Sequence, residues 1–486
     1  SRPTAVLVAH GIGQQMPMDT LRRFVTTVFG RRHDGIAREI YSKLDRDSSF
    51  LDMRRLSLPA DEGRGRVDFF EIYWAPVLSG GSATAVVTWT VKVLLRRPQG
   101  EQMRRLVWTM RAMLLGVAVL AGLLYYLLRD SGWWGYLVPL VPILVALKPV
   151  VRGLGTSVLT ETLADASRWF APGPRDIPER DRVRRLGLDL LVDLHGRDDE
   201  GEQRYGRIVV VGHSLGSVVA YDMIRLAYDR LREPAPVVDD TRPPAERQPA
   251  AWHFGEEKAA LLSTGDVGHF QDVQSRLHAE QRAQGVPWLV TDLVTVGSPL
   301  AHATDLWRSN VAGFAERVAE SEFPACPPYG VEQNKEKRRQ AGGKPAMTGA
   351  AGPIAFYRRT ETGPLIAHEA SPFASTRWTN LYIPVRPWLG GDPVGGKVAP
   401  TLGPGVRDIA VRPSTKKPWA SAIPVAAHTW YWRRDPDVSE DDAGEDGDRP
   451  DAVRRLAEVI RLERPQPGPY ERRDPAPPAS LSPAPP

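Results

Sequence analysis

Short runs of apolar, β-branched residues recur along the chain, and several of them end in a glycine-rich turn. Runs of this kind, bounded by turn formers, predict buried strands, and here they cover residues 4–9, 66–74, 207–211, 288–296 and 379–385. Between them, apolar residues at helical spacing predict helices, for example over residues 181–195. Strands that alternate with helices indicate an α/β fold, with a mainly parallel sheet flanked by helices.

Two longer apolar stretches interrupt this alternation. Residues 112–128 and 131–147 each lack a charged residue, and only Arg129 and Asp130 separate them. Each stretch is near the lower limit for crossing a bilayer. Arginines precede the pair, Lys148 and Arg152 follow it, and aromatic residues lie beside the turn. This pattern predicts a membrane hairpin over residues 106–150, with both open ends on the cytoplasmic side. A hydrophobic lid or monotopic docking surface, and a hairpin buried in a soluble core, are the two alternatives.

These patterns divide the chain into four parts. Residues 1–80 are expected to form the first part of an α/β core, and residues 81–155 a hydrophobic hairpin insertion. Residues 156–432 are expected to complete the core, with further insertions. Residues 433–486 are acidic and then proline-rich, which predicts a disordered C-terminal tail.

The composition excludes some classes of function. The chain has 486 residues, and its 63 Lys and Arg against 58 Asp and Glu give a formal net charge of only +5. The basic residues are scattered, without the basic stripe interleaved with aromatic residues that indicates nucleic-acid binding, so no nucleic-acid partner is expected. The single cysteine, Cys326, excludes an internal disulfide and a cysteine-rich zinc site. Neither a metal nor an organic cofactor is expected.

One serine stands between two glycines at a point where a predicted strand becomes a predicted helix. Gly212, Ser214 and Gly216 form the pattern G-x-S-x-G. In this pattern a sharp turn raises the serine hydroxyl above the sheet, at the start of a helix. Side chains two residues before and after the serine would collide in such a turn, so glycine is expected there. An ordinary glycine-rich turn is the alternative, but the strand before it and the helix after it favour a nucleophilic serine.

At these residues the chain resembles the α/β-hydrolase superfamily, and within it the lipase-like serine hydrolases. The similarity is carried by "GHSLGS" from Gly212, "HGIG" from His10, "TVGSPL" from Thr295 and "TNLYIPVRPWLGGDPVGG" from Thr379. There is also a distant similarity to membrane-associated, lipid-deacylating members. The resemblance implies an α/β-hydrolase fold and a catalytic triad in the chain order Ser, then Asp or Glu, then His.

A serine hydroxyl needs a histidine to take its proton and a carboxylate to orient that histidine. The superfamily order makes Asp392, in "GGDPVGG" after the last predicted strand, the expected acid, with Asp408 as the runner-up. Asp435 is disfavoured because it follows the histidine. His428 is the expected base because it alone among the histidines follows that acid; a histidine in an aromatic surface cluster is the alternative reading.

The oxyanion of the acyl-transfer reaction needs two backbone N–H donors. Leu215, directly after the serine, and Ile12, after the His-Gly pair, are the expected donors. Gly11 and Gly13 let the backbone approach closely, and His10 is expected to support this turn; an ordinary strand end is the alternative. Ser298 is expected to be structural.

These residues predict a serine hydrolase that cleaves carboxylic esters, those of lipids in particular, through an acyl-enzyme. An acyltransferase of the same fold and a non-catalytic membrane-bound scaffold are the alternatives. The protein is expected to be membrane-associated, with its hydrolase part in the cytoplasm.

Overall fold

The structure is a computed structural model of the chain. It describes residues 2–11, 16–31, 37–45, 53–61, 64–78, 97–98, 100–130, 132–133, 138, 141, 169, 176–234, 242–307, 314, 317–318, 321–328, 356–357, 364–385, 391–417, 427–435, 438 and 449–462. At residues 102, 106, 109, 110, 113, 114 and 244 it describes the backbone alone.

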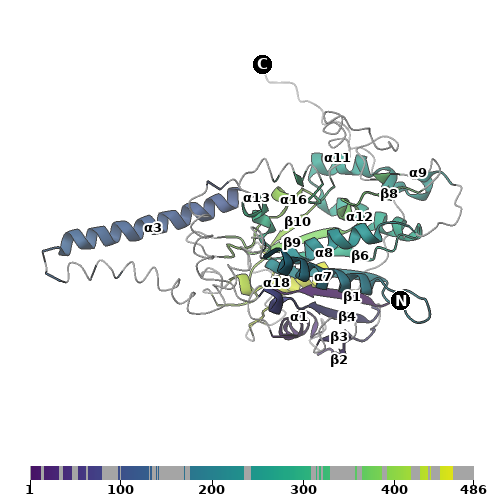
Figure 1. Cartoon of the computed structure of the whole chain (residues 1–486), viewed down its shortest axis with the longest axis horizontal. Helices are drawn as coiled ribbons and strands as arrows, with labels where there is room; N and C mark the ends of the chain where they lie inside the picture. The colour runs from purple at the N-terminus through teal and green to yellow at the C-terminus, as the bar shows by residue number, and fades with distance from the viewer. Residues whose placement is uncertain are drawn as a thin grey trace, which may run out of the picture.

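Eight strands of the described chain form one sheet, in the order β10-β9-β6-β5-β1-β4-β3-β2 (Figure 1). Six of them are parallel: β1 (Thr4–Ala9), β4 (Val67–Ile72), β5 (Arg207–His213), β6 (Val290–Val296), β9 (Arg377–Tyr382) and β10 (Arg407–Ala410). The edge strands β3 (Arg54–Leu58) and β2 (Tyr41–Leu44) extend the sheet by antiparallel pairing. The predicted α/β class and the mainly parallel sheet are therefore confirmed.

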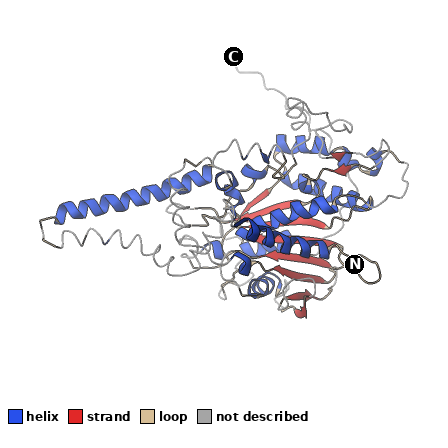
Figure 2. Ribbon diagram, viewed as in Figure 1, coloured by secondary structure: helices blue, strands red, loops and turns tan. Residues whose placement is uncertain are grey.

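The central strands β1, β4, β5 and β6 are buried on both faces, and their side chains alternate between two cores, whereas the edge strand β2 is exposed. In β1, Ala5 and Leu7 belong to one core, whereas Val6 and Val8 belong to the other. This follows from the period of two in a strand, and it explains why the middle of β1 and of β5 is a continuous apolar run. The first core holds side chains of α7 (Asp176–Leu194), α8 (Leu215–Leu231), α11 (Phe254–Thr264) and α12 (Val267–Ala283), and the second holds those of α1 (Asp19–Phe29) and α18 (Ala452–Ile460) (Figure 2).

Short elements complete the described chain. They are η1 (Ala75–Leu78), α9 (Pro244–Arg247), α10 (Pro249–Trp252), η2 (Pro299–His302), α13 (Ala303–Leu306), η3 (Pro372–Ala374), α16 (Ala399–Leu402), η5 (Ala427–Thr429) and a two-stranded sheet of β7 (Phe356–Tyr357) and β8 (Ile366–Ala367).

The direction of chain connection changes between β1 and β5. From β1 the chain continues to β4 on one side, and it then returns to place β5 on the other side of β1. At such a switch point in an open α/β sheet, the loops that leave the carboxyl ends of the two strands separate and leave room for a ligand. The turn after β1 holds Gly11, and the turn after β5 holds Ser214.

The predicted disordered tail is wrong for its central part, because residues 452–460 form α18. Its segment "AVRRLAEVI" buries Val453, Leu456 and Ile460, which share one face at helical spacing, and the Asp451 side chain caps it by accepting a hydrogen bond from Arg454 N–H. The acidic and proline-rich sequence around this segment concealed its amphipathic pattern. Residues 463–486 lie outside the described chain.

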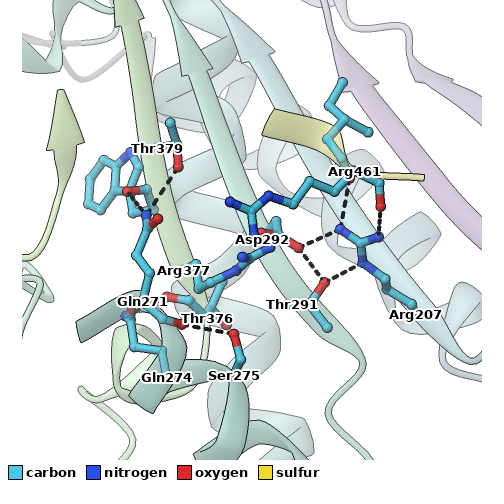
Figure 3. A network of polar contacts seen from close by, with 12 residues as sticks. Arg207, Gln271, Gln274, Ser275, Thr291, Asp292, Thr376, Arg377, Thr379 and Arg461 are labelled. Atoms are coloured by element: carbon cyan, nitrogen blue, oxygen red, sulfur yellow. Dashed lines mark hydrogen bonds and ion pairs between the residues drawn. The ribbon is translucent and has the colours of Figure 1, made fainter. Parts of the chain in front are cut away.

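A network near the amino ends of β5, β6 and β9 joins α18 to the sheet (Figure 3). Asp292 accepts hydrogen bonds from Arg207, at 2.7 Å, and from Arg377. Arg207 also donates to the carbonyl groups of Ile460, at 2.8 Å, and Arg461, at 2.7 Å. A cation at these terminal carbonyls satisfies groups that have no partner within the helix, so α18 is a fixed part of the core.

The helix α3 (Glu101–Leu128) has 28 residues and projects away from the rest of the molecule (Figures 1 and 2). It contains the first predicted apolar stretch. The second stretch lies outside the described residues, except for Gly132, Trp133, Val138 and Val141. A search of the described residues finds no helix with the length and apolar character needed to cross a membrane, so the predicted membrane hairpin is not shown. The alternative of a hairpin buried in a soluble core is wrong for α3, because Leu115 and Val119 are exposed.

Candidate active site

Ser214 lies at the junction of β5 and α8 in a strained conformation. Its φ of 53° and ψ of −131° fall in a region that side chains other than glycine rarely adopt, and which costs about 1–3 kcal/mol. Its N–H donates to the carbonyl group of Val296, at 3.0 Å, which fixes the turn against the end of β6. A serine in this place commonly caps the helix, but the Ser214 hydroxyl makes no capping hydrogen bond to α8. The strain is therefore not explained by helix capping.

The two glycines of the motif are required by close packing. A Cβ atom on Gly212 would lie 2.5 Å from Cα of Ser217. A Cβ atom on Gly216 would lie 2.3 Å from the carbonyl oxygens of both Ala9 and His10. Glycine at these positions therefore lets α8 begin directly against the turn that follows β1.

Asp392 and His428 are brought together at the carboxyl edge of the sheet. Asp392 follows β9, His428 lies in η5, and both carboxylate oxygens of Asp392 are 3.0 Å from Nδ1 of His428. Burial raises the pKa of Asp392. The charge of His428 and hydrogen bonds from His428, Tyr431 and the Gly395 N–H outweigh this effect and bring the pKa to about 2. Asp392 is therefore ionised at neutral pH, and Nδ1 of His428 carries the proton that it donates to Asp392.

His213, the neighbour of Ser214, links the serine turn to this pair. Its ring stacks on the ring of His428 with centroids 4.8 Å apart, and its Nε2 donates to the backbone carbonyl of His428 at 2.9 Å. Burial, and next the charge of His428, lower the pKa of His213 to about 3, so it is neutral. Gly297, with a φ of +56°, packs directly against the Asp392–His428 pair. A Cβ atom there would lie 3.0 Å from Oδ2 of Asp392 and 3.1 Å from Nδ1 of His428.

Tyr431 is a further residue of the site, and the sequence analysis missed it. Its buried hydroxyl donates to Oδ2 of Asp392 at 2.7 Å and accepts from the N–H of Ile383 at 2.8 Å. The only signal in the sequence is its position three residues after His428, which is one helical turn. That spacing does not distinguish Tyr431 from the other aromatic residues of "HTWYW".

His10 is placed to hold the turn after β1. It is buried, its ring is stacked on Trp74, and its Nε2 accepts a hydrogen bond from the backbone N–H of Trp74 at 3.2 Å. Nδ1 therefore carries the proton, and it donates to the carbonyl of Gly11 at 2.7 Å. Burial lowers the pKa of His10 to about 4, partly offset by this hydrogen bond, so His10 is neutral.

Of the two expected oxyanion donors, the structure describes Leu215 but not Ile12. Leu215 begins α8, and the first N–H groups of a helix have no intrahelical acceptor. Ile12 and Gly13 lie outside the described residues. Gly11 lies next to the serine, because a Cβ atom on it would be 3.1 Å from Cβ of Ser214.

The alternative residues serve other contacts. Asp408 accepts from Asn380 Nδ2 at 2.7 Å and from two N–H groups at the start of α16, and burial raises its pKa. Asp435 accepts from Thr415 and Lys417, both at 3.0 Å. Ser298 Oγ lies 2.6 Å from Ser217 Oγ and caps η2 through Leu300 N–H, so its environment is structural.

Within the described chain, no group of three or more His, Cys, Asp or Glu side chains is arranged to hold a metal ion. Comparisons of the chain with family models, curated proteins and solved structures give no match. The site geometry therefore carries the functional argument alone.

Proposed function

We propose that the protein is a serine hydrolase of the α/β-hydrolase type that cleaves carboxylic esters. One observation carries the proposal: the buried Asp392–His428 pair packs against His213, the neighbour of a strained serine that directly precedes α8. The elements support the same fold type, because the proposed nucleophile, acid and base follow β5, β9 and β10 in chain order, at the carboxyl edge of one sheet.

In the proposed reaction, the Ser214 hydroxyl attacks the acyl carbon while Nε2 of His428 takes its proton. Asp392 stabilises the imidazolium and holds its orientation. The negative charge on the acyl oxygen is stabilised by the N–H groups of Leu215 and Ile12. His428 then protonates the departing alkoxide, and the acyl group remains on Ser214. Water, deprotonated by His428, releases the acid and restores the serine.

An acyltransferase would use the same acyl-enzyme with an acceptor other than water. A non-catalytic scaffold would need neither the strained serine nor the buried Asp392–His428 hydrogen bond. Strain of this kind persists only where the surrounding structure enforces it, and it clusters at functional sites. The observations therefore favour an enzyme over a scaffold.

The test is hydrolysis of a panel of esters, together with labelling by a fluorophosphonate probe. We expect wild type to react with both, and Ser214→Ala to lose the label and on the order of 10⁶-fold in turnover. Asp392→Asn should lose roughly 10⁴-fold in turnover, because the histidine loses its orienting acceptor. Ser298→Ala is the matched serine control and should keep its label.

Two results would change the proposal. A folded wild-type protein that neither hydrolyses esters nor takes the label would support the scaffold. Transfer of the acyl group to an added alcohol in preference to water would support the acyltransferase. If Asp408→Asn abolished turnover while Asp392→Asn did not, the assignment of the acid would be wrong.

A further inference from the structure

The projecting helix α3 exposes apolar side chains along most of its length. Between Ala112 and Leu128 the sequence has no charged residue. Leu115, at 66%, and Leu127, at 63%, mark the two ends of the exposed segment. Others exposed along it are Val119, Leu120, Leu123, Tyr125 and Tyr126. A helix that leaves this much apolar surface in water needs an apolar environment to cover it.

The exposed side chains cover about 220° of the helix circumference, from Tyr125 through Leu115 to Leu120, and the remaining face carries Val117, Ala121, Leu124 and Leu128, which are buried or half-buried. At about 100° per residue, Leu115 and Leu120 point about 140° apart, and so do Leu120 and Tyr125. A helix that packs on a protein partner buries one apolar stripe of about 100°, whereas the exposed apolar surface of α3 is about twice as wide. The acyl chains of a lipid surface cover an apolar area of this width.

The charged residues of α3 all precede its apolar segment, and Arg129 and Asp130 follow that segment directly. Arg104 and Arg105 are exposed near its base, where Arg105 forms an ion pair with Glu101 at 2.5 Å. At the tip, Arg129 and Asp130 approach within 3.7 Å, and the Arg129 guanidinium lies over the Tyr126 ring. The uncharged segment of 17 residues is about 25 Å long as an α-helix. Cations and tyrosines beside an apolar segment suit the polar layer of a lipid surface.

The base of α3 is joined to the edge of the sheet that holds the candidate active site. Met103 and Val107 are buried, and the N–H of Gly100 donates to Asp305 of α13 at 3.1 Å. The preceding element, η2, holds His302, whose Nε2 donates to the carbonyl of Pro393 at 3.2 Å. Pro393 directly follows Asp392. A surface that received α3 would therefore lie on the same side of the molecule as the site.

We propose that α3 is a lipid-docking helix. Its apolar segment enters the acyl layer of a lipid surface, and the site at its base then takes an ester of a lipid from that surface. The second part rests on the proposed hydrolase function, and the first part does not.

Flotation with phosphatidylcholine vesicles containing phosphatidylglycerol tests the docking with the full chain, diluted from mild detergent. We expect wild type to float with the vesicles, and the double variant Leu120→Glu, Leu123→Glu to bind at least 10-fold more weakly, because two carboxylates would have to leave water. Leu262→Glu is the matched control: Leu262 is also exposed, at 62%, but it lies on α11. It should float as wild type does.

Hydrolysis measured in parallel separates the two parts of the proposal. The α3 double variant should keep its turnover of a soluble short-chain ester and lose at least 10-fold on the vesicle lipid. Wild type that stays unbound while it hydrolyses the soluble ester would overturn the docking alone. Wild type that floats without Ser214-dependent hydrolysis of either substrate would overturn the hydrolase. If the double variant floats unchanged and instead converts an oligomer to a monomer in light scattering, α3 contacts a second copy of the chain and the lipid proposal is wrong.

Discussion

At the residue scale, the candidate site depends on how the charge of one buried carboxylate is balanced. Asp392 accepts hydrogen bonds from His428 and Tyr431, and its Oδ1 also accepts from Val394 N–H at 2.9 Å. Tyr431 also makes a second hydrogen bond, because its hydroxyl oxygen accepts from the N–H of Ile383, which directly follows β9. It therefore fixes the distance between β9 and the carboxylate as well as the proton affinity of that carboxylate.

We expect Tyr431→Phe to move the acid limb of the kcat/KM profile to higher pH. The tyrosine hydrogen bond lowers the pKa of Asp392, so without it the carboxylate is more basic and binds the proton at Nδ1 of His428 more strongly. The variant should also lose about 1–3 kcal/mol of stability, because the buried Ile383 N–H loses its acceptor. The measurement is a pH–rate profile with a soluble ester, beside urea unfolding.

Tyr382→Phe is the matched control for this variant, because Tyr382 ends β9 and does not bond to Asp392. Its acid limb should coincide with that of wild type. A Tyr431→Phe protein that is less stable but has an unshifted profile would reduce Tyr431 to a purely structural residue.

At the element scale, the site depends on the close contact between α8 and the end of β1. We expect Gly216→Ala to weaken both the fold and the activity. Its Cβ atom would overlap the carbonyl oxygens of Ala9 and His10, which are backbone atoms and cannot rotate away. Overpacking of this kind costs about 1–3 kcal/mol. The displacement would also separate the turn at Gly11 from Ser214, so kcat/KM should fall by more than the loss of folded protein explains.

Gly268→Ala in α12 is the matched control, since its Cβ atom would meet Asp266 at an ordinary 3.4 Å. Its stability should change by no more than about 1 kcal/mol, and alanine is the better helix former. Equal activity of wild type and Gly216→Ala would show that the contact does not position the site.

The elements that are best predicted from the sequence are those whose pattern depends only on neighbouring residues. Thr4–Ala9 is a strand with the predicted bounds, because a buried parallel strand needs a continuous apolar run and its limits are set by the turns beside it. α18 was missed because a nine-residue amphipathic helix is a weak signal within an acidic, proline-rich region. Tyr431 was missed because its role depends on Asp392, and a sequence does not show which loops meet. The motif around Ser214 was visible because its glycines are needed by local backbone geometry.

At the scale of the whole molecule, burial favours the neutral form of several histidines and of two glutamates. Burial lowers the pKa of His10 and His195 to about 4 and that of His213 to about 3. Burial also raises the pKa of Glu71 to about 8 and of Glu280 to about 7. Within the described chain, Oε1 of Glu71 has no hydrogen-bond partner, as suits a neutral carboxyl. The histidines bind a proton more readily in the unfolded chain, and the glutamates release one more readily there.

The two types act in opposite directions on stability. Below the unfolded histidine pKa of about 6.5, the histidines bind protons in the unfolded chain but not in the folded protein. The free energy of unfolding therefore falls as the pH falls toward about 4. Above the unfolded glutamate value of about 4.3, the unfolded chain releases protons that folded Glu71 and Glu280 keep. The stabilisation from neutral Glu280 is therefore lost as the pH rises through about 7, and that from neutral Glu71 as it rises through about 8. Each group contributes about 1.4 kcal/mol per pH unit within its window.

We therefore expect the free energy of unfolding to be greatest near pH 6.5. Between about pH 4.5 and 6.5 three histidines outweigh two glutamates, and stability rises with pH. Between pH 6.5 and 8 the two glutamates outweigh the histidines, which are still partly protonated in the unfolded chain near pH 6.5, and stability should fall by roughly 1–2 kcal/mol. Urea unfolding at pH 5 to 8.5 measures this curve. Glu71→Gln, which is neutral in both states, should lose most of the alkaline decline and move the maximum to higher pH. If wild type were equally stable at pH 6.5 and 8, or if Glu71→Gln declined as steeply as wild type, the two glutamates would not be neutral in the folded protein.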